Sequence, residues 1–155
     1  MGKKQFDYYL FIDYSENYIG YLVLDKCNLG DCVNVSSRFR HYKNARNKKL
    51  YLKNAKKTFN KKEILDLFLK KKVREVIQTP EIFADVAEIL KKYKDFRIFV
   101  SVDDRQYKNF EKFVKIVDGE NALIVKEGKL KKGSREYKVN LILDTWLNIE
   151  RTKSK

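Results

Sequence analysis

The sequence predicts a mixed α/β fold, in which antiparallel strands open the chain and helices alternate with strands afterwards. Residues 6–25 read as two apolar strands with period-two alternation, joined by a polar turn at 14–17. After residue 60, apolar residues recur at helical spacing between short β-rich runs at 73–78, 96–102 and 122–126. These two patterns predict an α/β (α+β mixed) sheet with helices packed on its faces.

The opening strands and the segment after them predict a three-stranded antiparallel meander. The first strand ends at Asp13, and a second strand covers 18–24. A turn at 28–31 then leads into a third strand over 32–39. Cys27 and Cys32 flank that turn, and we expect two reduced thiols, with a disulfide across the hairpin as the alternative.

Helix-start signals place the later elements. Asn60 with Glu63 forms a capping-box pattern before a helix over 64–69, and Thr79-Pro80 is a strong helix start. Asp103-Asp104 precedes a further helix, and Ser134 can cap the last one. The resulting order is a three-stranded meander followed by helix–strand alternation, and we expect residues 1–155 to form one domain.

The chain is strongly basic. Its 35 Lys and Arg residues against 21 Asp and Glu residues give a formal net charge of +14. Such an excess favours a polyanionic partner, usually nucleic acid, with an acidic protein or an anionic membrane as alternatives. The frequent Lys and scarce Gln, Met and Pro are typical of proteins from heat-loving organisms. No secretory leader or membrane-spanning apolar run is recognisable, so we expect a cytoplasmic protein with no membrane association.

Positive charge is concentrated in residues 38–62, which contain eleven Lys or Arg residues and no acid. Aromatic residues are interleaved with them, and this combination favours phosphate neutralisation together with base stacking. The alternative is a solvated, mobile loop over 40–60. A second basic loop covers 127–135. The predicted nucleic-acid-binding residues are Arg38, Arg40, Tyr42, Lys43, Arg46, Lys48, Lys49, Tyr51, Lys53, Lys56, Lys57, Lys131, Lys132 and Arg135.

The first hairpin carries a family resemblance. Phe11-Ile12-Asp13-Tyr14-Ser15, followed by 19–24 with Gly20 near the start of the second strand, resembles the opening hairpin of the ribonuclease H-like superfamily. It is most similar to the branch of Holliday-junction resolvases and their relatives. Tyr14 departs from the pattern, because the family usually has a smaller residue there. The meander leading into α/β alternation is also similar to that fold.

The resemblance implies a nuclease dependent on Mg²⁺ or Mn²⁺. Its catalytic carboxylates would be Asp13, then Asp103 or Asp104, then Asp144, and its metal ligands Asp13, Asp103 and Asp144. Hard divalent ions take such oxygen ligands, and two ions about 4 Å apart can activate water and stabilise the leaving oxygen.

Each acid also has a structural interpretation. Asp13 can cap the hairpin turn by accepting from nearby backbone N–H groups, and Asp103-Asp104 can cap the helix that follows. Asp144 lies in line with Asn140 and Asn148, a stripe typical of a solvated helix face. The sequence therefore predicts a nucleic-acid-binding protein with a ribonuclease H-like fold. If the protein is an enzyme, the predicted activity is that of a metal-dependent nuclease. The alternative is a non-catalytic RNA- or ribosome-associated, or protein-interaction, module. DNA and RNA both remain open as partners, as does the oligomeric state.

Overall fold

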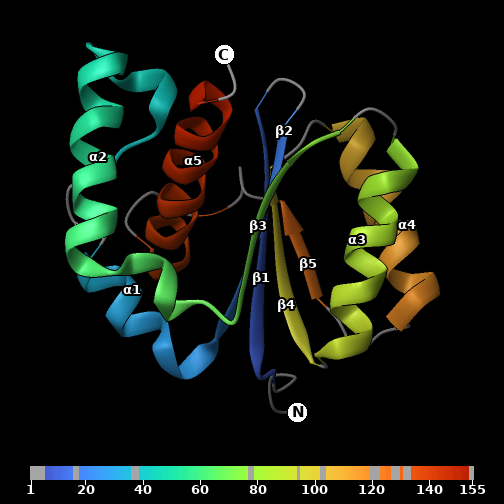
Figure 1. Cartoon of the computed structure of the whole chain (residues 1–155). Helices are drawn as coiled ribbons and strands as arrows, with labels where there is room; N and C mark the ends of the chain where they lie inside the picture. The colour runs from blue at the N-terminus through green and yellow to red at the C-terminus, as the bar shows by residue number, and fades with distance from the viewer. Residues whose placement is uncertain are drawn as a thin grey trace.

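The computed structural model describes residues 6–15, 18–35, 39–76, 79–93, 95–101, 104–118, 123–126, 130 and 134–153. Within these residues a twisted sheet lies between two layers of helices (Figure 1). One layer contains α1, α2 and α5, and the other contains α3 and α4. The helices are α1 (Leu29–Val35), α2 (Lys48–Lys62), α3 (Thr79–Lys92), α4 (Asp104–Asp118) and α5 (Arg135–Lys153).

The sheet has β1 at its centre. Its strands are β1 (Tyr8–Ser15), β2 (Tyr18–Asp25), β3 (Lys70–Glu75), β4 (Phe96–Ser101) and β5 (Leu123–Lys126). Their spatial order is β3-β2-β1-β4-β5. β1 pairs antiparallel with β2 and parallel with β4, β2 pairs antiparallel with β3, and β4 pairs parallel with β5. The predicted mixed sheet is confirmed, with its antiparallel half at β1–β3 and its parallel half at β4–β5.

The period-two pattern of β1 explains why helices cover both faces. Tyr9 and Phe11 pack on the side of α5, whereas Leu10 and Ile12 pack on the side of α3 and α4. Phe11, Leu10 and Ile12 are fully buried. A strand with apolar residues on both faces needs a cover on each face, and the two helical layers provide it.

The third antiparallel strand is not the segment that the sequence predicted. Residues 32–39 do not form a strand in their described part, because 32–35 belong to α1 and Phe39 lies outside any element. The third strand is β3, far along the chain, so the helical segment 29–67 is inserted between β2 and β3. Both cysteines are free thiols, Cys27 exposed and Cys32 buried, and they lie in two consecutive helical elements, the 3-10 turn η1 (Lys26–Asn28) and α1, instead of across a hairpin.

The basic segment forms a helix, and the boundaries predicted around it are wrong. α2 begins after Asn47, whose side chain accepts a hydrogen bond from the Leu50 N–H at 3.0 Å. It ends at Glu63, which adopts a left-handed conformation with φ 50°. The helix expected over 64–69 is only a 3-10 turn, η3 (Ile64–Leu67), and the strand expected at 73–78 begins at Lys70. Glu63 therefore terminates a helix, although the sequence suggested that it begins one.

The second half of the chain follows the prediction closely. α3, β4, α4 and β5 occupy the predicted places, and the Ser134 hydroxyl accepts a hydrogen bond from the Tyr137 N–H at 3.2 Å before α5. In the described part of the chain, none of the helices has the length and apolar character that a bilayer crossing requires.

Candidate nucleic-acid interface

Helix α5 is the central helix of its layer, between the sheet and α1 and α2 (Figure 1). It is held close to the sheet at Gly20, because a Cβ atom there would lie 2.8 Å from Leu143 Cδ1. Real Cβ contacts are not that short, so a larger residue at this position would require Leu143 or its helix to shift. The absence of a side chain at Gly20 therefore leaves room for Leu143 against β2.

Asp13 lies inside the sheet and not at the end of its strand. β1 continues through Tyr14 and Ser15, which pair with β2, whereas β4 ends opposite Asp13 at Ser101. The Asp13 side chain is buried, at 3% exposure, and its Oδ1 accepts a hydrogen bond from the Tyr14 N–H at 2.8 Å. That bond is the type of contact that the capping interpretation expects. The alternation along β1 places this carboxylate on the α5 side of the sheet.

Asp144 is also buried, and the polar stripe to which it belongs is not solvated. Asn140, Asp144 and Asn148 are exposed by 1%, 5% and 2%. The Tyr42 N–H donates a hydrogen bond to Asp144 Oδ2 at 2.7 Å, and His41 Nδ1 lies 3.7 Å from Asp144 Oδ1. The expected solvated face is thus wrong, because the segment before α2 covers it and supplies polar partners.

Tyr51 forms a second hydrogen-bonded contact between the basic segment and α5, in addition to that of Tyr42 with Asp144. Its hydroxyl lies 2.8 Å from the Thr145 hydroxyl, donates to the Arg40 carbonyl at 2.9 Å and accepts from the Arg40 N–H at 3.0 Å. Burial raises the pKa of Tyr51, so the hydroxyl stays protonated at neutral pH. Together with the apolar residues Leu52 and Phe59 of α2, which belong to the core, these bonds make α2 a docked helix.

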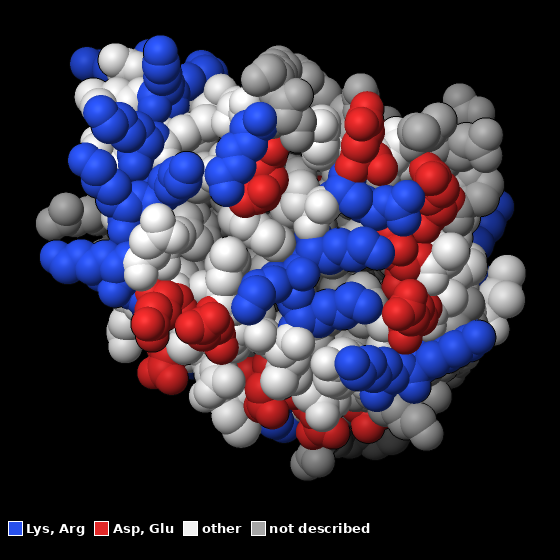
Figure 2. All heavy atoms as spheres, viewed as in Figure 1, with Lys and Arg blue, Asp and Glu red and all other residues white. Residues whose placement is uncertain are grey.

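Within the part of the chain that the structure describes, the lysines of α2 form no ion pairs, unlike those of β3. At β3, Lys72 lies 3.3 Å from Asp85, Arg74 lies 3.1 Å from Glu81, and Lys70 lies 3.8 Å from Glu88. Among the described residues, no ion pair involves a Lys or Arg between positions 40 and 62. Figure 2 shows the contrast, with basic side chains clustered over α2 and basic and acidic side chains intermixed over β3 and α3. Exposed α2 lysines include Lys48, Lys49, Lys53, Lys56 and Lys57.

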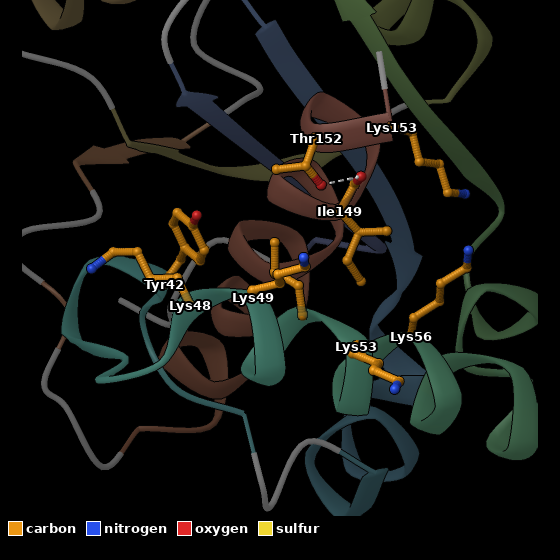
Figure 3. A pocket seen from close by; sticks show the side chains of 9 residues that line it. Tyr42, Lys48, Lys49, Lys53, Lys56, Ile149, Thr152 and Lys153 are labelled. Carbon is orange, nitrogen blue, oxygen red and sulfur yellow. Dashed lines mark hydrogen bonds between the residues drawn. The ribbon is translucent and has the colours of Figure 1, made fainter. Parts of the chain in front are cut away.

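A groove of about 670 Å³ runs between α2 and the last turns of α5 (Figure 3). α2 contributes Lys48, Lys49, Leu52, Lys53 and Lys56, and α5 contributes Ile149, Thr152 and Lys153, with Tyr42 from the 3-10 turn η2 (Tyr42–Asn44). The groove therefore combines an apolar floor with a cationic rim.

The other predicted residues that the structure describes do not line this groove. Arg135 opens α5, about 27 Å along the helix from Lys153 at 1.5 Å per residue. Arg40, Lys43 and Arg46 lie on the segment before α2, and Arg40 is exposed. Arg38, Asp103, Lys131 and Lys132 lie outside the described residues, and only the backbone of Asp104, the first residue of α4, is described.

Sequence reasoning missed the residues that α5 contributes to the groove. Ile149, Thr152 and Lys153 come from the end of the chain, about a hundred residues from α2, and no local pattern links them to it. Arg151 was also missed. It is 7% exposed, donates to Asn148 Oδ1 at 3.0 Å, and lies 5.8 Å from the centroid of the Tyr42 ring. In the sequence, its position three residues after Asn148 was the signal that could have predicted this hydrogen bond.

Comparison with known proteins gives a result at the level of structure alone. Neither a protein-family model nor a curated protein sequence matches the chain. The structure is similar to the crystal structure of ribonuclease H2 from Pyrococcus horikoshii OT3, with a TM-score of 0.56 and 16% identity, over 94% of this chain and 72% of that one. It is also similar to ribonuclease HII from Archaeoglobus fulgidus, solved in a complex with PCNA, with a TM-score of 0.57 and 12% identity, over 94% and 73%.

The fold is ribonuclease H-like. The resemblance seen in the first hairpin is thereby confirmed for the fold, and the strand order β3-β2-β1-β4-β5 with its mixed pairing is its framework. At these identities the similarity describes the fold and not the chemistry.

The described residues do not by themselves form a site for the Mg²⁺ or Mn²⁺ that this fold family implies. No group of three His, Cys, Asp or Glu side chains within the described part of the chain could hold a metal ion. Asp13 offers a buried carboxylate, whereas the Asp144 oxygens contact the Tyr42 N–H and His41. The third proposed ligand, Asp103, lies outside the described residues, so the set of Asp13, Asp103 and Asp144 stays a prediction.

The position of Asp144 makes a prediction about stability. Asp144→Ala leaves the buried Tyr42 N–H without this acceptor and should lower the free energy of unfolding by about 1–3 kcal/mol. Asp144→Asn keeps an acceptor oxygen of the same shape and should cost clearly less. Urea unfolding of the two variants and the parent chain measures the difference. Equal stability of Asp144→Ala and the parent would show that this carboxylate does not hold the segment before α2.

Proposed function

We propose that this protein binds nucleic acid through the lysines of α2. The observation that carries the proposal is the contrast between the two basic surfaces: β3 lysines are paired with acids of α3, and α2 lysines are not paired within the described residues. Like charges held close together repel, and phosphate groups that approach them relieve this repulsion and release counterions.

The rigid attachment of α2 supports the proposal. The helix is capped by Asn47 and fastened to α5 through Tyr51 and the apolar residues Leu52 and Phe59. Its lysines therefore project from a fixed backbone, and less conformational freedom is lost when a ligand binds. The ribonuclease H-like fold agrees with such a partner, since the ribonucleases to which it is similar carry RNA cleavage in their names.

A quadruple variant tests this proposal directly. Changing Lys48, Lys49, Lys56 and Lys57 to Ala should weaken binding of a labelled oligonucleotide. On a duplex it should also flatten the dependence of log Kd on log salt by up to about 0.9 for each lost phosphate contact. Fluorescence anisotropy across a salt series gives both quantities.

A matched control variant distinguishes the effect of the α2 lysines from the effect of a lower net charge. Lys91, Lys108, Lys112 and Lys115 are exposed on α3 and α4, across the sheet from α2. Their replacement by Ala removes the same four charges and should leave the affinity and the salt slope nearly unchanged. If both quadruple variants lose affinity equally, net charge and not α2 governs binding, and the proposal is wrong.

Hydrolysis of the bound strand is the second candidate function, and the burial of Asp13 favours it. A carboxylate at 3% exposure inside a sheet is costly to desolvate unless hydrogen bonds or a cation offset the cost. Asp13 would be one metal ligand, with Asp103 and Asp144 as the further ligands that the family resemblance implies. A bound divalent ion would supply an activated water and stabilisation of the leaving oxygen.

The hydrolysis hypothesis predicts Mg²⁺-dependent cleavage of a labelled branched or looped substrate by the parent chain. Asp13→Asn should reduce cleavage to the level seen without added metal, while oligonucleotide binding persists because α2 is unchanged. Gel analysis of the products, with anisotropy on the same preparations, measures both. Undiminished cleavage by Asp13→Asn would rule out this carboxylate as a ligand.

A further inference from the structure

The groove between α2 and α5 is amphiphilic, and both helices contribute to its apolar part and to its cationic part (Figure 3). Leu52 of α2 and Ile149 of α5 form apolar surface, and the half-buried Tyr42 closes one end. Lysines from α2 line one wall, and Lys153 stands on the other. A ligand that fills this groove must therefore present a flat or apolar part inward and negative charge outward.

On the α2 side of the groove, the rim lysines form no ion pairs with the described residues and are available to a negatively charged ligand. Lys153 lies 3.1 Å from Glu150, so its charge is partly offset. Lys49, Lys53 and Lys56 form no ion pair with any described carboxylate. These three lysines follow one side of α2 at spacings of four and three residues, so their ammonium groups form a row along the groove.

We propose that this groove takes a single-stranded stretch of nucleic acid, with an unstacked base on the floor and the flanking phosphates on the lysine row. The inference rests on the proposed function and specifies the form of its ligand. In a duplex the bases are stacked inside and only phosphates and groove edges face outward, so the apolar floor would stay uncovered. An unstacked base offers a flat face that apolar and aromatic side chains accept, while the backbone follows a positive groove.

The size of the groove agrees with this ligand. About 670 Å³ lies within the range of pockets that hold ligands of small-molecule size. The groove is thus of the size for one base with its sugar and phosphates, whereas a duplex would meet only its lysine rim. Thr152 is exposed on the α5 wall, so a larger side chain there can fill the groove without removing charge.

The test compares two labelled oligomers of about eight nucleotides, within the usual site size of single-strand binders. One carries bases and the other is abasic with the same phosphates. The parent chain should bind the base-carrying oligomer about tenfold more tightly, the gain expected from one stacked base. Thr152→Leu, which fills the groove and adds no aromatic face on which a base could stack, should remove this preference and leave the affinity for the abasic oligomer unchanged. Asn109→Leu, at an exposed site on α4, should keep the preference and serves as the control.

The outcomes separate this inference from the proposed function. Equal affinity of the parent for both oligomers, or an unchanged preference in Thr152→Leu, overturns the groove assignment. Nucleic-acid binding through α2 would still stand in that case if the quadruple lysine variant loses affinity. No binding of either oligomer or of a duplex by the parent contradicts the proposed function itself. Tighter binding of a duplex than of the base-carrying strand also overturns the groove assignment.

Discussion

The close contact of α5 with the sheet is the constraint on which the rest of the structure depends. Gly20 leaves room for Leu143 against β2, and every residue of α5 from Val139 to Ile149 is buried. A helix buried on all sides must satisfy its polar residues internally. Asp144 and Thr145 do so through the segment that precedes and opens α2, so the packing of α5 on the sheet also decides where the basic helix lies.

The charge distribution gives the two faces of the molecule different roles. On the β3 edge, basic side chains and the acids of α3 neutralise one another. These ion pairs link β3 to α3. On α2 and the segment before it, ten basic residues between positions 40 and 62 have no acid in the same stretch of sequence. Their repulsion lowers the stability of the folded state. The buried bonds of Tyr51 and Asp144 hold the segment in place against that repulsion.

The sequence predicted those elements that are determined by neighbouring residues, and it failed for those that depend on contacts between distant segments. The period-two pattern of 6–25, the Thr79-Pro80 start and the Ser134 cap are local, and the hairpin, α3 and α5 were predicted correctly. Residues 32–35 were misassigned because the packing of the short helix α1 on α5 overrides the local strand preference of Val33 and Val35. The polar stripe of α5 was interpreted as a solvated face. The residue that contacts Asp144, Tyr42, lies 102 residues earlier, and no pattern within the helix sequence indicates this contact. The α2 lysines were predicted to bind nucleic acid from charge alone, which stays a prediction, and the groove that they share with Ile149 and Thr152 arises only in three dimensions.

The central claim is that a docked, unpaired lysine surface on α2 contacts the polyanion. Lysine acetylation read by mass spectrometry, with and without an oligonucleotide, tests it most directly because one experiment reports on every exposed lysine. Bound nucleic acid should slow modification of Lys48, Lys49, Lys53 and Lys56 and leave Lys108 and Lys112 on α4 at their original rates. Uniform protection of all of these lysines, or protection confined to α4, would contradict the account.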